Sequence, residues 1–191
     1  QATGWFSDVR INPVNGPLGV QVVVQVEPFP TLSRVELDPV SEELPDEVVE
    51  EIFSPDYGRT LNLNDLQKRM KDLQGWYAGQ GYSLARISGP ERVSPEGVVT
   101  LKLIQGSVAG VEVQFLNKEG ETTNEKGEPI RGKTKPWVIT REISIKPGEA
   151  FNRNQLEGDI KRLYGTSLFS DVKVTLKPVA GNPGEVNIVL G

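Results

Sequence analysis

The chain of 191 residues contains no cysteine and no histidine. Without cysteine there is neither a disulfide framework nor a thiolate metal site. Without histidine the chain lacks the commonest zinc ligand and the usual general base, so neither a Ser-His-Asp nor a Cys-His arrangement can be built. We therefore predict that the protein is not an enzyme and that it needs no metal or cofactor.

Long apolar runs and an excess of basic residues are missing as well. The longest apolar run, "VQVVVQV" (Val20–Val26), has the length of a strand, whereas a membrane-spanning helix needs roughly 18–20 apolar residues. The formal net charge is -5, and residues 30–106 carry 8 basic against 13 acidic side chains. Nucleic-acid backbones attract clustered Lys and Arg, so we expect no nucleic-acid partner.

The most informative feature of the sequence is an internal repeat. "GRTLNLNDLQKRMKDLQG" (Gly58–Gly75) aligns without a gap with "GEAFNRNQLEGDIKRLYG" (Gly148–Gly165), at an offset of 90 residues. Upstream, "PDEVVEEI" and "PWVITREI" match in the same order. A partial third copy is present, because "WFSDVRI" near the start parallels "LFSDVKV" near the end. Self-similarity of this kind indicates a repeat architecture.

The period of each segment predicts its secondary structure. "SRVELDP" and "AGVEVQF" are short β-rich runs that read as strands. A helix is expected from Pro45, followed by a second helix that Asn64 caps and Gly75 ends, with Asn154 and Gly165 as the equivalents in the later copy. Two alternating runs follow, such as "SDVKVTL" and "EVNIVL". The unit is strand–helix–helix–strand–strand.

Units of this order, whose second helix ends in "LYGTSLFSDVKV", resemble POTRA (polypeptide-transport-associated) domains of BamA-type outer-membrane assembly factors and their cyanobacterial and chloroplast outer-envelope relatives. The resemblance implies an α+β fold of tandem repeats, each β-α-α-β-β with a three-stranded mixed sheet packed on two helices. It divides the chain into the C-terminal part of a truncated repeat (1–29), a complete repeat (30–106), and a complete membrane-proximal repeat (107–191) with a long loop at 117–135.

The same resemblance implies a function and a set of partners. The chain would be an arm in the periplasm, or in the chloroplast intermembrane space, attached to a C-terminal β-barrel that this sequence does not contain. The arm would receive unfolded outer-membrane proteins by β-augmentation and hand them to the barrel. Two alternatives are the arm of a secretion or preprotein-import channel, and a scaffold that docks accessory subunits without binding clients.

Strand addition needs an open sheet edge, and the strand before the last one of each unit is the candidate. The predicted peptide-binding edge residues are Val9, Arg10, Ile11, Leu84, Ala85, Arg86, Ile87, Val172, Lys173 and Val174. A possible apolar groove would be lined by Trp76 and Tyr77, although such aromatics more often belong to a core. The insertion 117–135 is polar and is interpreted first as a mobile loop, or as a hairpin if it orders. The alternative is contact with the barrel through Lys118, Lys126, Arg131 and Lys133.

The repeated Ser-Asp of "FSDV" raises the question of a catalytic pair. Ser170 and Asp171 are expected to begin a strand, and neighbouring side chains of a strand point to opposite faces. The motif therefore predicts a structural turn from helix to edge strand. Phe169, Trp5 and Phe6 are expected to be buried there.

Overall fold

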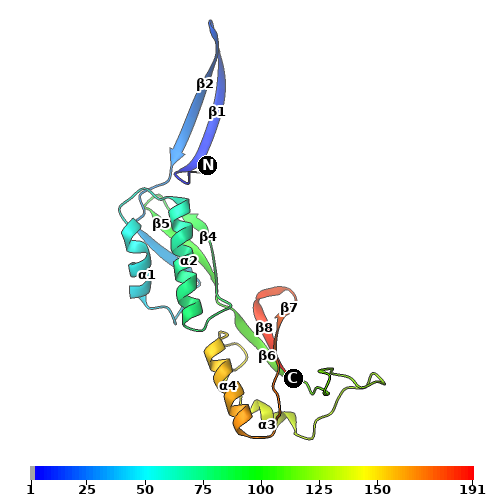
Figure 1. The fold of residues 1–191 in the computed structure, drawn as a ribbon. Coiled ribbons are helices and arrows are strands. Elements are labelled where there is room, and N and C mark those ends of the chain that lie inside the picture. Colours follow the sequence, from blue (N-terminus) through cyan, green and yellow to red (C-terminus); the bar gives the residue numbers. More distant parts are fainter. Residues whose placement is uncertain (1–2) are drawn as a thin grey trace. The chain divides into compact units, whose positions relative to one another are not determined.

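The computed structural model describes residues 3–191 and consists of two compact units, each built around a small sheet (Figure 1). Unit 1 comprises the chain up to Trp76 together with Ile87–Leu103, and unit 2 comprises Tyr77–Arg86 together with Ile104–Gly191. The elements in chain order are β1 (Phe6–Gly16), β2 (Gly19–Pro28), β3 (Arg34–Asp38), α1 (Asp46–Phe53), the 3-10 turn η1 (Ser54–Asp56), α2 (Leu63–Gly79), β4 (Arg86–Val93), β5 (Val98–Ile104), β6 (Ser107–Val113), α3 (Pro136–Thr140), α4 (Arg153–Gly165), β7 (Val174–Val179) and β8 (Asn182–Leu190).

The main sheet of unit 1 has the strand order β3-β5-β4, with β5 in the centre and β3 parallel to it. The predicted apolar stripe of α2 is confirmed, because Leu66, Met70 and Leu73 are all buried. Val99, Leu101 and Leu103, which share one face of β5, are buried as well, and so is Thr100 between them. The core of this unit is thus one helix stripe against one face of a half-buried sheet.

Unit 2 repeats this plan with the strand order β6-β8-β7, in which β8 is parallel to β6 and antiparallel to β7. The core of unit 2 is formed by apolar side chains from α3, α4, the sheet and the segments between them. The buried members are Val108, Ile139, Ile143, Ile145, Phe151, Leu156, Leu163, Ile188 and Leu190. The fold class predicted from the repeat, β-α-α-β-β with a mixed three-stranded sheet and two helices, is confirmed.

Residues 6–28 form a two-stranded antiparallel sheet, in which β1 pairs with β2 from Phe6↔Pro28 to Gly16↔Gly19. One face is apolar: Val9 lies opposite Val26, and Ile11 lies opposite Val24. Ile11 and the valines at 22 and 24 are more than half exposed. Trp5, expected to be buried, is 43% exposed, so that expectation was wrong.

The helix boundaries differ from the sequence prediction in two respects. Gly165 ends α4 as expected, but α2 continues past Gly75 to Gly79. Gly75 has open space around it, so nothing forces the helix to stop there, and one more turn buries Tyr77 completely. The expected caps at Asn64 and Asn154 were also wrong, because the N–H groups of the first turn bond instead to the side chains of two earlier asparagines, 62 and 152.

A buried carboxylate that the sequence did not single out holds the two helical segments of unit 2 together. Asp159 on α4 has no exposed surface. Its oxygens accept hydrogen bonds from the backbone N–H of Ser144 (2.9 Å), the hydroxyl of Ser144 (2.7 Å) and the backbone N–H of Ile145 (3.3 Å). Arg162, one turn further along α4, pairs with the same carboxylate. The loop after α3 is thereby fastened to α4.

Candidate strand-addition edges

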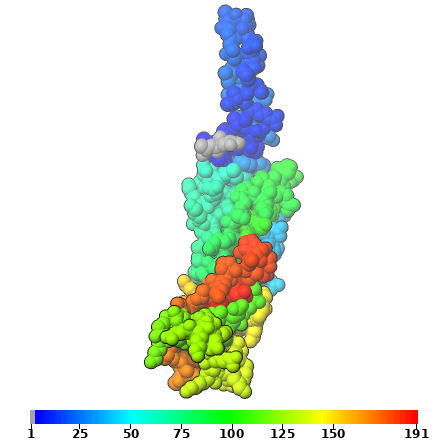
Figure 2. All heavy atoms as spheres, turned by 90° about the vertical axis from the view of Figure 1, so that its right-hand side faces the viewer, coloured from blue at the N-terminus to red at the C-terminus, as the bar shows by residue number. Residues whose placement is uncertain are grey.

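In each three-stranded sheet the strand that precedes the central strand in the chain lies at an edge, β4 in unit 1 and β7 in unit 2. The pairing of β7 with β8 is antiparallel. The last strand of each repeat, β5 or β8, lies in the centre of its sheet. The prediction of open edges assumed this arrangement. Main-chain groups of an edge strand that point away from the sheet can pair with an incoming extended peptide. Figure 2 shows β7 and β8, in orange and red, on the face turned toward the viewer.

The pairing of β7 with β8 fixes which of its main-chain groups point outward. Lys173 and Gly191 exchange two backbone hydrogen bonds, at 2.7 and 2.8 Å. Narrow pairs alternate with wide pairs in an antiparallel ladder, so Thr175 and Lys177 also face β8. The N–H and C=O groups of Val174 and Leu176 consequently face the open edge. The main chain of Pro178, two residues after Leu176, also faces the open edge. Proline has no N–H, so this position offers only its carbonyl to an added strand.

The side chains of β7 alternate as the sequence predicted. Val172, Val174 and Leu176 pack against the core of unit 2, whereas Lys173, Thr175 and Lys177 are exposed. The strand starts later than expected, however. Ser170, Asp171, Val172 and Lys173 all precede β7, and the N–H of Val172 bonds to the hydroxyl of Tyr164 (3.1 Å) and to Asp171 (2.9 Å). Of the three predicted edge residues in this segment, only Val174 therefore lies in the strand and presents open main-chain groups.

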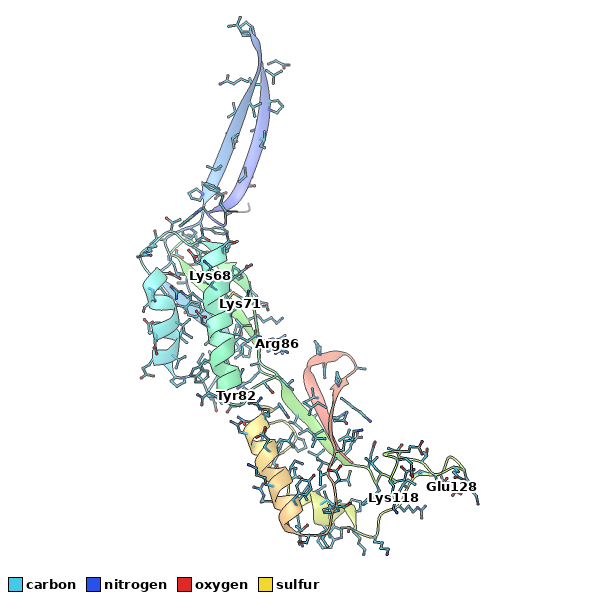
Figure 3. The ribbon with its side chains drawn as sticks, viewed as in Figure 1. Lys68, Lys71, Tyr82, Arg86, Lys118 and Glu128 are labelled. Atoms are coloured by element: carbon cyan, nitrogen blue, oxygen red, sulfur yellow. The ribbon has the colours of Figure 1, made fainter. Side chains whose placement is uncertain are left out.

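The edge strand β4 is less suited than β7 to pair with an added strand. Arg86 and Ile87 lie in it as predicted, but Gly89 with φ +127° and Pro90 interrupt its middle, and proline blunts a sheet edge. Leu84 and Ala85 were wrong as edge residues, because both precede the strand. Ala85 is buried and Leu84 packs against the core of unit 2. Figure 3 labels Arg86, whose guanidinium donates to the carbonyls of Ala85 (2.8 Å) and Ser83 (3.3 Å).

The first predicted edge, Val9, Arg10 and Ile11, lies in β1. All three residues pair with β2, at Val26, Gln25 and Val24 respectively. The outer side of β1 is an edge of a two-stranded sheet. Arg10 forms an ion pair with Asp8 (2.6 Å), two residues earlier on the same strand.

The proposed groove at Trp76 and Tyr77 was wrong for Tyr77. Its side chain has no exposed surface, and its ring meets that of Tyr82 edge-on with 6.2 Å between the centroids. Trp76 is half-buried on α2. The helical period explains the result, because Tyr77 follows Leu66, Met70 and Leu73 on the buried stripe.

Unit 2 does contain a groove, which sequence reasoning missed. It has a volume of about 650 Å³ and adjoins the segment that leads into β7. Its apolar lining comes from residues far apart in the sequence, which no local pattern connects: Phe115, Leu116, Ile139, Leu163, Leu168, Phe169 and Leu190. Leu168 is 54% exposed there, and Phe169, predicted to be buried, is partly buried and packs against the core of unit 2.

The loop predicted to contact a barrel holds two copies of one turn. In "NKEGE" the side chain of Asn117 accepts from the N–H groups of residues 119 and 121, and in "NEKGE" Asn124 does the same with 126 and 128. Lys118 and Glu128, labelled in Figure 3, lie on these turns. Lys118, Lys126, Arg131 and Lys133 are all exposed, and their contact with a barrel stays a prediction.

These features agree with comparisons to known proteins. A family model for the POTRA domain, ShlB-type, matches residues 31–106, and a second, described as POTRA, surface antigen variable number repeat, matches residues 129–190. The solved structure of POTRA1-3 of the periplasmic domain of Omp85 from Anabaena is 47% identical, with a TM-score of 0.93, over 99% of this chain and 75% of that one. The chain belongs to the Omp85 family. The N-terminal domain of Omp85 from Thermosynechococcus elongatus is 41% identical, with a TM-score of 0.79, over 99% of this chain and 77% of that one.

Among curated relatives, outer envelope protein 80, chloroplastic, from Oryza sativa subsp. japonica is 27% identical over 172 residues, which is 90% of this chain and 24% of that protein. The chain thus spans about a quarter of the length of this relative. Omp85 POTRA domains are non-enzymatic, which confirms the prediction that the chain is not an enzyme. No helix within residues 3–191 has the length and apolarity to cross a membrane.

Proposed function

We propose that this chain is the substrate-receiving arm of an Omp85-type outer-membrane protein, and that it binds unfolded outer-membrane proteins by strand addition to β7. The proposal rests on one observation: the backbone N–H and C=O groups of Val174 and Leu176 point away from β8, toward the open edge of the sheet. A client strand would find two N–H donors there and three carbonyl acceptors, counting that of Pro178. Each such bond contributes about 0.5–1.5 kcal/mol net, so the grip is weak and independent of client sequence.

The surroundings of β7 support an extended apolar client. The edge leads into the segment 170–173, which lines the groove of about 650 Å³. A strand paired with β7 that runs on in this direction would place one or two side chains against Leu168 and Phe169. We accordingly propose a periplasmic location, or the intermembrane space of the chloroplast envelope, with the β-barrel of the full-length protein as the next recipient of the client. The division of the chain at residues 29 and 106 into part of one POTRA repeat and two complete repeats belongs to the same proposal. The two family models, which match residues 31–106 and 129–190, support its second and third parts.

The test is to replace Leu176 with proline, with Leu176→Ala as the matched control. Both variants lose the leucine side chain, but only proline removes the outward N–H, and neither breaks a bond to β8. We expect the proline variant to bind a ten-residue peptide of alternating apolar and polar residues about ten-fold more weakly than the alanine variant, since about 1.4 kcal/mol corresponds to a factor of ten.

Binding would be followed by NMR titration of the labelled chain, with the amides of Val174 and Leu176 as reporters. Equal affinity of the two variants would exclude β7 as the edge that is used. Peptide binding by neither the native chain nor the alanine variant would favour the scaffold alternative, in which the arm contacts accessory subunits alone.

A further inference from the structure

The beginning of α4 is held by two backbone carbonyls that belong to the turn after α2. In unit 2 the Nδ2 of Asn152 donates to the carbonyl of Gln80 (3.0 Å), and the N–H of Arg153 donates to the carbonyl of Gly81 (2.8 Å). The Oδ1 of Asn152 meanwhile accepts from the N–H groups of Asn154 and Gln155, at 3.0 and 3.2 Å. One asparagine therefore caps its own helix and holds the neighbouring turn at the same time.

The same arrangement occurs in unit 1, at the beginning of α2. The Nδ2 of Asn62 donates to the carbonyl of Thr3 (3.0 Å), and the N–H of Leu63 donates to the carbonyl of Gly4 (3.0 Å). The Oδ1 of Asn62 accepts from the next two N–H groups of the first turn, at 2.9 and 3.3 Å. We call this set of four hydrogen bonds the carbonyl clamp. Its occurrence twice, at positions 90 residues apart for the asparagine, shows that it is a feature of the repeat.

Glycine is required on the carbonyl side of the clamp for two reasons. Gly4 and Gly81 have φ values of +77° and +95°, which other residues rarely adopt. A Cβ on Gly81 would in addition lie 2.5 Å from the Oδ1 of Asn152, and one on Gly4 would lie 2.7 Å from the Oδ1 of Asn62. Any side chain at these positions would displace the asparagine.

A third turn of the same kind follows α4. The backbone N–H of Thr166 donates to the carbonyl of Leu163 (3.2 Å), and the backbone N–H of Ser167 donates to the carbonyl of Tyr164 (3.1 Å). In the turn after α2 the equivalent bonds, from the N–H groups of residues 80 and 81 to the carbonyls of residues 77 and 78, have the same lengths. Ser167, with φ 56°, thus takes the place of Gly81, and it is the one non-glycine residue with positive φ in the described part of the chain.

We propose that this position selects whether a POTRA repeat accepts another one. A glycine admits the asparagine-capped first turn of the next repeat's second helix, whereas the Cβ of Ser167 occupies the space that the capping asparagine needs. The turn of residues 166–167 is thereby closed to a further repeat of this type. This inference rests on the repeat architecture and not on client binding.

The first test places serine where the clamp exists. Gly81→Ser is compared with Gly148→Ser, which lies in the same unit at φ +89° but has no atom within 4 Å of the added Cβ. Both variants carry the strain of a left-handed serine, and only the first meets the asparagine. We expect hydrogen exchange of the Arg153 amide to quicken at least ten-fold in Gly81→Ser and to stay unchanged in Gly148→Ser, with the Leu163 amide as a check that α4 is folded.

The second test asks whether glycine at 167 is sufficient. Residues 107–191 are repeated once directly after Gly191, in one chain with Ser167 and in another with Ser167→Gly in the preceding copy. We expect the Arg153 amide of the added copy to be protected only in the glycine chain. Equal protection in both chains, or in neither, overturns the selector role, as does an unchanged Arg153 amide in Gly81→Ser.

Discussion

Replacing Asp159 with alanine is expected to lower the free energy of unfolding of unit 2 by about 3 kcal/mol or more. The carboxylate is fully buried and accepts three hydrogen bonds from the loop at Ser144 and Ile145. Its removal leaves two backbone N–H groups without their acceptor, whereas Arg162, which is 48% exposed, keeps its hydrogen bond to the carbonyl of Glu142. A donor that loses its buried acceptor costs about 1–3 kcal/mol, so the two N–H groups together account for the expected loss.

Urea denaturation combined with hydrogen exchange at the Ile145 amide would measure the loss. Glu157→Ala is the matched control, because Glu157 is a carboxylate on the same helix that is 60% exposed and meets Arg153 only at 3.7 Å. Exposed pairs of this kind contribute about 0–1 kcal/mol. A loss no larger for Asp159→Ala than for Glu157→Ala would show that the buried carboxylate does not hold the loop.

Unit 1 places a charge of opposite sign at the matching position. The 90-residue offset of the repeat pairs Asp159 with Arg69, whose guanidinium bonds to Asp56 in η1 at 2.9 and 3.3 Å. In both units the second helix therefore fastens the segment that follows the first helix. The Asp56 side chain keeps 21% of its surface exposed, whereas that of Asp159 has none, so the carboxylate in unit 1 is the better solvated of the two.

Replacing Tyr77 with alanine is expected to destabilise the protein by about 3–5 kcal/mol, the range for removing a large buried aromatic side chain. Tyr77 has no exposed surface, and its ring packs edge-on against Tyr82. The burial of this ring stabilises the last turn of α2, which continues beyond Gly75 to Gly79. The variant should therefore also fray the end of α2.

The comparison with Trp76→Ala separates a core role from a groove role. Trp76 is only half-buried, so its loss should shift the urea midpoint less. The slope of the transition should stay constant in both variants if the unfolded state is unaffected. A Tyr77→Ala protein of native stability with weakened peptide binding would restore the groove hypothesis that the burial of this residue contradicts.

The sequence by itself determined the repeat and the order of its elements. The ungapped match at an offset of 90 residues, the apolar stripe through Leu66, Met70 and Leu73, and the alternation at Val172, Val174 and Leu176 are local patterns. Local patterns of this kind predict helices and strands with one buried face, and the packing agrees. The absence of histidine and cysteine, together with the POTRA resemblance, gave the non-enzymatic class.

Only the tertiary structure decided where elements end and which groups remain open. Gly75 is compatible with both a helix end and a helix interior, and the burial of Tyr77 chose the second. Asn62 and Asn64 are equally good caps by residue type, and the carbonyls of Thr3 and Gly4 selected Asn62. The outward phase of Val174 and Leu176 follows from pairing with β8, a contact that no single segment contains. Such choices depend on partners distant in the sequence, and local pattern therefore left them undetermined.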